Sequence, residues 1–304
     1  MYKVQVNVPA AITNLGPGLR TVGLALNLHM HIEMYIRQDG ELDIKVEGED
    51  EDAIPDDFQN PVLRAATRLF QKKEMAPAGL SISIKNRIPF NVGLDAEAAM
   101  LIGGLVAANN LTGGDYERDD LIELAMELGL QKVEAQTTML GGLNIVVGEV
   151  DDIPLQKSLE PPPLKMVVFV PDIPEFASNT ANAMPESVTL DDAIFNMGRL
   201  VFMMDALMDG DFDLLATTMQ DRLYQARFTD HIPGYESVVA AAKENGASAV
   251  TMASMGPTLL AFAPYNHNLI GEAMQAAFNA AGVQNCRFWT LGIDAQGVTV
   301  SVLS

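Results

Sequence analysis

Three glycine-containing segments are the parts of this 304-residue sequence best suited to chemistry. They are Asn14-Leu-Gly-Pro-Gly18, Ile88-Pro-Phe-Asn-Val-Gly-Leu-Asp-Ala-Glu-Ala-Ala99 and Ala253-Ser-Met-Gly-Pro-Thr258. Glycine and proline let a backbone turn tightly and approach a ligand closely. The second segment leads from an expected strand into an expected helix, whose N-terminal N–H groups would bind an anion such as phosphate. Each segment taken alone is also compatible with a purely structural turn.

The second segment carries two carboxylates, Asp95 and Glu97, where such an anion would bind. A carboxylate about 4 Å from a phosphate charge costs roughly 4 kcal/mol at an effective dielectric constant of about 20. That energy corresponds to about a thousandfold loss of affinity for each contact. Alternatively, the two side chains stabilise the positive N-terminus of the helix, by about 0.3–1 kcal/mol each.

No other kind of catalytic or metal site stands out. The four histidines, His29, His31, His231 and His267, are not joined by a cysteine or a further histidine cluster, so no metal site is expected. Cys286 is expected in the core of a strand. The 40 acidic residues are too numerous for any one acid–base pair to be singled out.

The composition is that of a globular protein in a reducing compartment. Hydrophobic residues make up 48% of the chain and charged residues 19%, and a single cysteine argues against a disulfide-stabilised secreted protein. We therefore expect a cytoplasmic protein. The net charge of −21 disfavours nucleic acid and anionic lipid as partners. The sequence contains no run of 18 apolar residues, so no membrane span is expected.

The elements expected to position these segments fall into two groups. In the first, strands are expected at residues 3–8, 29–36, 42–46, 80–85 and 142–148, and helices at 61–70, 98–109 and 118–128. A proline-containing stretch at 151–165 is expected to join the groups. In the second, strands at 165–170, 249–252, 258–262, 287–291 and 298–303 and helices at 235–243 and 269–281 suit a helix-covered antiparallel sheet.

One further helix is expected to begin at a variant of the capping box, Thr189-Leu-Asp-Asp192. Its apolar residues recur at a spacing of three and four, which predicts a single buried face. That face contains Ile194, Met197, Val201, Met204 and Met208. We interpret its methionines as flexible filling of the core.

Together, in this order and spacing, the three glycine segments resemble the GHMP kinase superfamily, and within it the homoserine kinases, over nearly the whole chain. The other matching segments are Val8-Pro-Ala10, Gly23-Leu-Ala-Leu-Asn27, Gly104-Leu-Val-Ala-Ala-Asn109, Leu140-Gly-Gly-Leu143, Met184-Pro-Glu-Ser187, Asp221-Arg-Leu223 and Ile232-Pro-Gly234. The resemblance implies a two-lobed α/β (α+β) fold, with a ribosomal-S5-like lobe over residues 1–155 and a ferredoxin-like lobe over residues 156–304. It also implies ATP bound between the lobes, phosphate transfer to a small hydroxy acid or alcohol and, as in many members, a homodimer.

Departures from the family pattern fall on its phosphate loop. Gly93 and Leu94 match the pattern, but Asp95 replaces the third glycine and would lose the positive φ that glycine allows. Ala96 and Glu97 replace the two serines that hold Mg²⁺ and phosphate oxygens in the family. The resemblance therefore places protein carboxylates where the family binds phosphate.

A second group of departures concerns the metal ligand and the residues after it. The family's metal-binding glutamate aligns with Gly129, and the histidine and asparagine that follow it align with Gln131 and Glu134. Both the phosphate loop and the metal ligand of the family are thus replaced in this chain.

The residues that the family uses for its substrate are also replaced. Arg20 stands where an acidic residue is expected to hold the substrate amine or hydroxyl group. Ala181 and Phe228 stand where arginines are expected to hold the substrate carboxylate, although Arg227 is adjacent to the second. Ser254 replaces the first glycine of the third motif.

We therefore predict a catalytically degenerate homoserine kinase-like protein, a pseudoenzyme, that binds a small molecule or a protein partner and has no cofactor. One alternative is an active Mg-ATP-dependent kinase for homoserine or a related hydroxy compound, with Arg20, Lys132 and Arg227 supplying positive charge and Glu97 or Glu134 holding Mg²⁺. Another is a non-kinase enzyme that reuses the inter-lobe cleft, with Arg20 facing Asp95 and Glu97. The degenerate phosphate loop comprises Gly93, Leu94, Asp95, Ala96 and Glu97, and the other cleft candidates are Asn14, Gly16, Gly18, Arg20, Gln131, Glu134, Arg227, Ser254 and Gly256.

Overall fold

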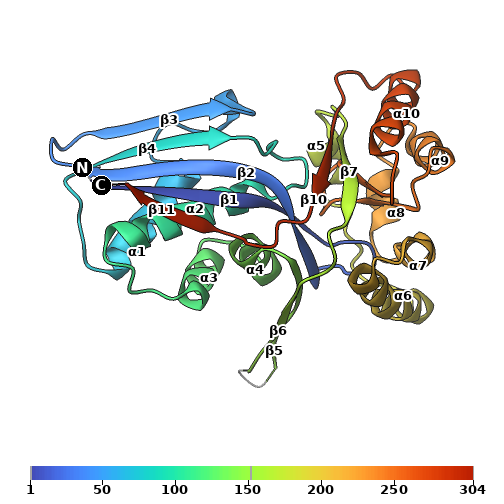
Figure 1. Cartoon of the computed structure of the whole chain (residues 1–304), viewed down its shortest axis with the longest axis horizontal. Helices are drawn as coiled ribbons and strands as arrows, with labels where there is room; N and C mark the ends of the chain where they lie inside the picture. Colours follow the sequence, from blue (N-terminus) through green and yellow to red (C-terminus); the bar gives the residue numbers. More distant parts are fainter. Residues whose placement is uncertain (1, 151–152, 304) are drawn as a thin grey trace.

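The structure, a computed structural model, describes residues 2–150 and 153–303 and has two lobes, each built on its own β-sheet (Figure 1). The N-terminal lobe has a seven-stranded sheet and the C-terminal lobe a four-stranded one. This arrangement confirms the predicted two-lobed α/β class. No helix within the described ranges is long and apolar enough to cross a membrane.

The N-terminal sheet is ordered β11-β1-β2-β4-β3. Its strands are β1 (Lys3–Thr13), β2 (Val22–Arg37), β3 (Leu42–Gly48), β4 (Gly79–Asn86) and β11 (Thr299–Leu303), and β5 (Leu143–Val150) pairs with β2 and with β6 (Ile153–Leu159). Only β3 and β4 run parallel. Alternating side chains of β1, such as Val4, Val6 and Val8, are buried because one face of the sheet is covered by helices.

Four helices cover that face of the N-terminal sheet (Figure 1). They are α1 (Pro61–Lys72), α2 (Ala96–Leu111), α3 (Arg118–Glu127) and α4 (Lys132–Leu140), and a short 3₁₀ helix, η1 (Glu51–Ala53), follows β3. Helix α2 is buried on nearly every side. A Cβ atom at Gly103 would lie 2.4 Å from Ile32 and one at Gly104 2.4 Å from the Val62 carbonyl oxygen. The absence of side chains at this glycine pair therefore lets α2 pack closely against β2 and α1.

The C-terminal sheet is antiparallel, in the order β10-β7-β9-β8. Its strands are β7 (Lys165–Val170), β8 (Ala249–Met252), β9 (Leu259–Phe262) and β10 (Arg287–Gly292). The helices of this lobe are α5 (Phe176–Thr180), α6 (Leu190–Asp209), α7 (Phe212–Thr218), α8 (Gln225–Thr229), α9 (Tyr235–Glu244) and α10 (His267–Ala280).

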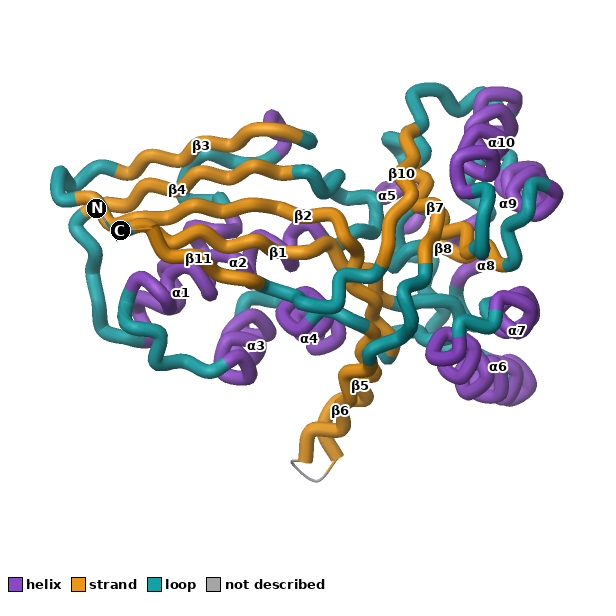
Figure 2. Tube along the Cα trace, in the orientation of Figure 1, coloured by secondary structure: helices purple, strands orange, loops and turns teal. Residues whose placement is uncertain are grey.

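Two strands cross the division expected from the sequence. The predicted strand at 298–303 was assigned to the C-terminal sheet, but β11 pairs with β1 in the N-terminal lobe, with Asn7 opposite Thr299. The stretch at 151–165, expected to be a junction, contains β6, which forms a projecting hairpin with β5 (Figure 2). Residues 151 and 152 of that stretch lie outside the described residues. The boundary between 155 and 156 therefore does not separate the strands of the two sheets.

The predicted buried face of the helix at 190–209 is confirmed for Met204 and Met208, which are partly buried against the core, and wrong for its first half. Ile194, Met197 and Val201 are exposed on α6. The fully buried residues of the helix are Asn196, Met203, Ala206 and Leu207, none of which belongs to the predicted face. Because apolar residues occur on both sides of α6, the three–four spacing alone did not identify the side that faces the core.

Candidate functional site

The second and third glycine segments are locked together at the junction of the lobes. Gly93 has a φ of 89°, and a Cβ atom there would lie 2.4 Å from the Ala253 carbonyl oxygen. A Cβ atom at Gly256 would lie 2.0 Å from the Val92 carbonyl oxygen. These contacts leave room only for hydrogen, so the second and third glycine segments lie directly against each other.

The first glycine segment borders the same site. The Thr13 N–H donates to Ser254 Oγ at 2.8 Å. Asn14 has a φ of 57° and accepts the Arg20 N–H at 2.6 Å through its side chain, which closes the loop around Gly16 and Gly18. A Cβ atom at Gly16 would lie 2.8 Å from the sulfur of a methionine on α7's C-terminal side, and one at Gly18 2.6 Å from a valine methyl group. The structure therefore brings all three segments together.

Asp95 lies at the centre of this junction. Its φ of 50° keeps the left-handed conformation, so the expected loss of the glycine-like φ is wrong. Aspartate is among the few residues that tolerate this region. The carboxyl group accepts long hydrogen bonds of 3.4 Å from the hydroxyl groups of Thr13 and Ser254. It makes no capping hydrogen bond to α2, so its partners are side chains of the junction rather than the helix N-terminus.

The protonation of Asp95 differs from what the sequence suggested. Burial, followed by the nearby charge of Glu134, raises the pKa of the Asp95 carboxyl to about 8. Part of the residue still has accessible surface, but its carboxyl group lies deep in the protein. At neutral pH the group is therefore mainly uncharged, and the predicted charge repulsion between Asp95 and a phosphate is largely absent. The remaining obstacle to a phosphate is the volume of the Asp95 side chain.

A cavity of about 190 Å³ lies beside the phosphate loop, and Asp95 is one of its lining residues. Two further carboxyl groups, those of Glu97 and Glu134, also line it. The Glu134 carboxylate accepts the Gln131 N–H at 2.8 Å, which forms the capping box of α4, and burial raises the pKa of Glu134. Glu97 is more than half exposed and lies 4.0 Å from Arg64. The cavity lining is Phe90, Asn91, Gly93, Asp95, Ala96, Glu97, Ala98, Leu130 and Glu134, without a basic side chain.

The predicted cationic residues are not gathered in this cavity. Arg20 and Arg227 are exposed and do not line it. No ion pair joins Arg20 to Asp95 or Glu97 in the parts of the chain that the structure describes. Phe228 is packed in the core of the C-terminal lobe and Ala181 ends α5, so the two positions where the family pattern has substrate arginines carry apolar side chains.

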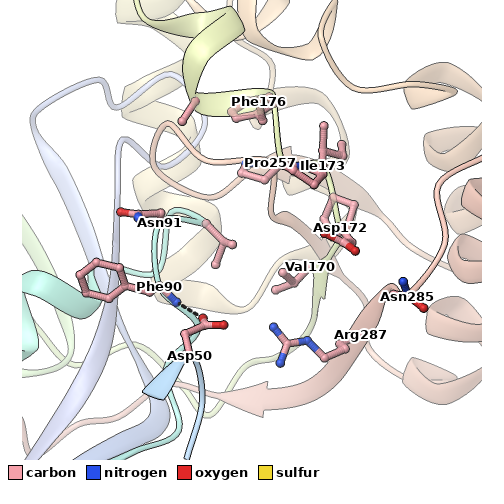
Figure 3. Close-up of a pocket in the computed structure, with 14 residues that line it drawn as sticks. Asp50, Phe90, Asn91, Val170, Asp172, Ile173, Phe176, Pro257, Asn285 and Arg287 are labelled. Carbon is pink, nitrogen blue, oxygen red and sulfur yellow. Dashed lines mark hydrogen bonds between the residues drawn. The ribbon is translucent and has the colours of Figure 1, made fainter. Parts of the chain in front are cut away.

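A larger cavity of about 570 Å³ lies between the lobes, beside the start of the phosphate loop (Figure 3). Its charged and amide groups are Asp50, Asn91, Asp172, Asn285 and Arg287. Asp50 accepts the N–H of the loop residue Phe90 at 2.8 Å. The sequence analysis identified the loop but not Asp50, Asp172, Asn285 or Arg287, because these residues belong to none of the three glycine segments.

We predict that the contact between the glycine segments is a major source of stability. Gly93→Ala should lower the free energy of unfolding by about 3 kcal/mol, because the new methyl group meets backbone and the φ is unfavourable. Gly129→Ala is the matched control, since its φ is 111° and nothing lies within 4 Å. It should cost about 1 kcal/mol, from backbone strain alone. Urea denaturation measures both values, and equal losses would show that the contact is not tight.

The chain matches two models of one family. The GHMP kinases N terminal domain matches residues 60–147, and the GHMP kinases C terminal model matches residues 203–280. The chain is 36% identical to a homoserine kinase of Moorella thermoacetica over 279 residues, which are 92% of this chain and 94% of that protein. It is 32% identical to a homoserine kinase of Caldanaerobacter subterraneus over 298 residues, which are 98% of this chain and 95% of that protein.

Solved structures share the fold. The crystal structure of homoserine kinase from Cytophaga hutchinsonii matches with a TM-score of 0.86 at 24% identity, covering 98% of this chain and 97% of that one. The crystal structure of L. major mevalonate kinase in complex with R-mevalonate matches with a TM-score of 0.70 at 14% identity, covering 96% and 95%. From its fold, its matching segments and these relatives of similar length, the chain belongs to the GHMP kinase family, as a homologue of homoserine kinases over nearly its full length.

Proposed function

We propose that this homoserine kinase-like protein binds a small molecule in its inter-lobe cleft and does not transfer phosphate from Mg-ATP. The observation that supports the proposal is the cavity at the phosphate loop, which three carboxyl groups and no basic side chain line. Its volume of about 190 Å³ is below the roughly 300–1,000 Å³ of typical small-molecule sites. Burying phosphates there would leave their charge without a cationic partner.

The larger inter-lobe cavity is the better place for a ligand. It has the size of a small-molecule site, and it presents the Arg287 guanidinium together with the carboxyl groups of Asp50 and Asp172 (Figure 3). Groups of both charge signs suit a small zwitterion such as an amino acid. The glycine-rich loop supplies one wall through Phe90 and Asn91.

An active Mg-ATP-dependent homoserine kinase is the second candidate, and the comparisons favour it over the first. Relatives of the same length that are 30–36% identical carry that name. The protonation of Asp95 also supports this candidate, because an uncharged carboxyl group repels phosphate much less than a carboxylate. In that case Glu97 or Glu134 would be the residues available to hold Mg²⁺.

Titration calorimetry with Mg-ATP separates the two candidates, and a phosphate-transfer assay with homoserine and threonine as acceptors accompanies it. The first candidate predicts no binding heat at 25 °C up to about 1 mM nucleotide and no turnover above background. Micromolar binding or turnover would contradict it and support the kinase. An active homoserine kinase, assayed in parallel, confirms that both measurements work.

The cellular setting follows from the composition and is part of the proposal. A single cysteine, which the structure buries, suits a reducing cytoplasm. The net charge of −21 argues against nucleic acid as a partner.

A further inference from the structure

The N-terminal sheet has a polar cavity of about 470 Å³ on the face opposite to helices α1–α4. Its floor is formed by β11, β1, β2 and β4, which lie side by side in this order (Figure 2). Because side chains alternate along a strand, the residues of β1 that lie between the buried Val4, Val6 and Val8 point to this face. The volume lies within the roughly 300–1,000 Å³ of typical small-molecule sites.

Two rows of polar side chains cross the cavity from strand to strand. In the first row each residue lies opposite the next in the strand pairing, in the order Thr299, Asn7, His31 and Lys85. The second row, two positions along each strand, is Ser301, Gln5, Glu33 and Ser83. Side chains directly opposite each other in an antiparallel sheet have Cβ atoms about 5 Å apart. A small ligand on these rows would therefore contact several polar groups at once.

The carboxylate of the cavity lining, that of Glu33, already has its partners. Lys3 Nζ donates to Glu33 Oε1 at 2.7 Å, and Gln5 Nε2 donates to Glu33 Oε2 at 3.0 Å. These two hydrogen bonds, that from Lys3 first, lower the pKa of Glu33. The negative charge of Glu33 is therefore matched by Lys3 and does not exclude an anion from the rest of the cavity.

Positive charge gathers at the other end of the rows. Neither Lys85 nor Arg87 forms an ion pair within the described ranges, although Glu47 lies opposite Lys85 on β3. Burial lowers the pKa of His31, and the charges of His29, Arg87 and Lys85 lower it further. A local excess of positive charge in a chain of net charge −21 indicates an anionic ligand.

The remaining polar groups of the cavity have free hydrogen-bonding capacity. Asn7 Oδ1 is buried and accepts no hydrogen bond in the part of the chain that the structure describes. A buried acceptor without a partner is unfavourable, and a hydroxyl group of a ligand would supply the missing donor. The hydroxyl groups of Ser83, Thr299 and Ser301 can each donate one hydrogen bond and accept others.

We propose that this cavity binds a small phosphate ester that carries hydroxyl groups, such as a polyol phosphate. The phosphate group lies at His31 and Lys85, and the hydroxyl groups face Asn7, Ser83 and Ser301. A phosphate ester fits better than a carboxylate, because it carries nearly two negative charges at pH 7 and three acceptor oxygens. The proposal does not rest on the proposed function, since this cavity shares no lining residue with the two cavities at the glycine segments.

The ring signals of the histidines, followed by NMR of the full chain between pH 5 and pH 8, test the proposal. Glycerol 1-phosphate at about 20 mM should raise the pKa of His31 by about one unit, because a nearby anion favours the charged imidazole. His231 and His267, in the C-terminal lobe, should not respond and are internal controls. An unchanged His31 would overturn the proposal, and binding confined to the glycine segments would give this result.

Two lysine variants test the position of the phosphate group. Lys85→Gln should weaken the binding of glycerol 1-phosphate about tenfold, as expected for the loss of one charged contact. Lys157→Gln is the matched control, because Lys157 is exposed on β6 and does not line the cavity. Equal losses in the two variants would overturn the placement at Lys85. Ser83→Asp, which adds a carboxylate, should abolish the response of His31, and circular dichroism confirms that each variant is folded.

The choice of probe tests the hydroxyl groups of the ligand. Inorganic phosphate should bind about tenfold more weakly than glycerol 1-phosphate, because it makes no contact with Asn7 or Ser301. Equal affinities would overturn the assignment to an ester and leave a site for a bare oxyanion. Asn7→Leu should reduce the affinity for the ester and leave that for inorganic phosphate unchanged, whereas an equal loss for both probes would contradict a separate role of Asn7.

Discussion

Restoration of the family's phosphate loop should increase Mg-ATP affinity on the order of a hundredfold. The variant Asp95→Gly/Ala96→Ser/Glu97→Ser removes the side chain that fills the junction and one exposed carboxylate, and it adds two hydroxyl groups. A carboxylate about 8 Å from a phosphate charge costs about 2 kcal/mol at an effective dielectric constant of about 20. Removal of Glu97 alone therefore provides more than tenfold, and the cleared space provides the rest.

Titration calorimetry at pH 7.5 measures this gain. The control variant Glu123→Gln removes one exposed carboxylate, as the restored loop removes Glu97, at a position that does not line the cavity. It should bind Mg-ATP no better than the wild type does. If the restored loop gains no affinity over this control, the replaced loop residues are not what limits nucleotide binding.

Replacement of Asp95 by asparagine should stabilise the protein increasingly as the pH rises. Burial raises the pKa of this carboxyl from 3.8 to about 8, so the folded state holds a proton that the unfolded state releases between about pH 4 and pH 8. The free energy of unfolding of the wild type therefore falls through this range. Each pKa unit corresponds to about 1.4 kcal/mol, and partial water access reduces the sum, so the gain at pH 9 is on the order of 4 kcal/mol.

Urea denaturation of wild type and Asp95→Asn at pH 4, 7 and 9 tests this expectation. Asparagine tolerates the left-handed conformation and can hydrogen-bond to Thr13 and Ser254 without ionising. The two proteins should be nearly equal in stability at pH 4. Glu97→Gln is the control, because that side chain is 57% exposed, and its difference from the wild type should stay small at every pH. A pH-independent difference for Asp95→Asn would show that the carboxyl is ionised in the folded protein.

Local pattern was enough to predict most elements and the meeting of the glycine segments. Strand β7 and strand β8 match their predicted ranges, because a short apolar run bounded by turn residues is a local signal. The lobe to which β11 belongs was not predictable in this way, since its partner β1 lies at the other end of the sequence. The exposed side of α6 was also missed, because the spacing of apolar residues does not show which side of a helix faces the core.

The chemistry of the candidate site was predicted only in part. The residue types at Asp95, Glu97 and Glu134 were sufficient to show that carboxyl groups replace hydroxyl groups. The charge of Asp95 depends on how much protein surrounds it, and this is a property of the folded lobes. Asn285 and Arg287 lie at the start of β10 and Asp172 follows β7, so the larger cavity joins segments far apart in the sequence that no local pattern links.

The return of β11 to the N-terminal lobe has a consequence for synthesis on the ribosome. Strand β1 is among the first segments to emerge, yet its edge stays unpaired until β11, which follows every other strand, has been made. An unpaired strand edge is a common starting point for aggregation. The N-terminal sheet therefore stays incomplete until the whole C-terminal lobe has been translated. We expect chaperones that shield strand edges to increase the yield of this protein.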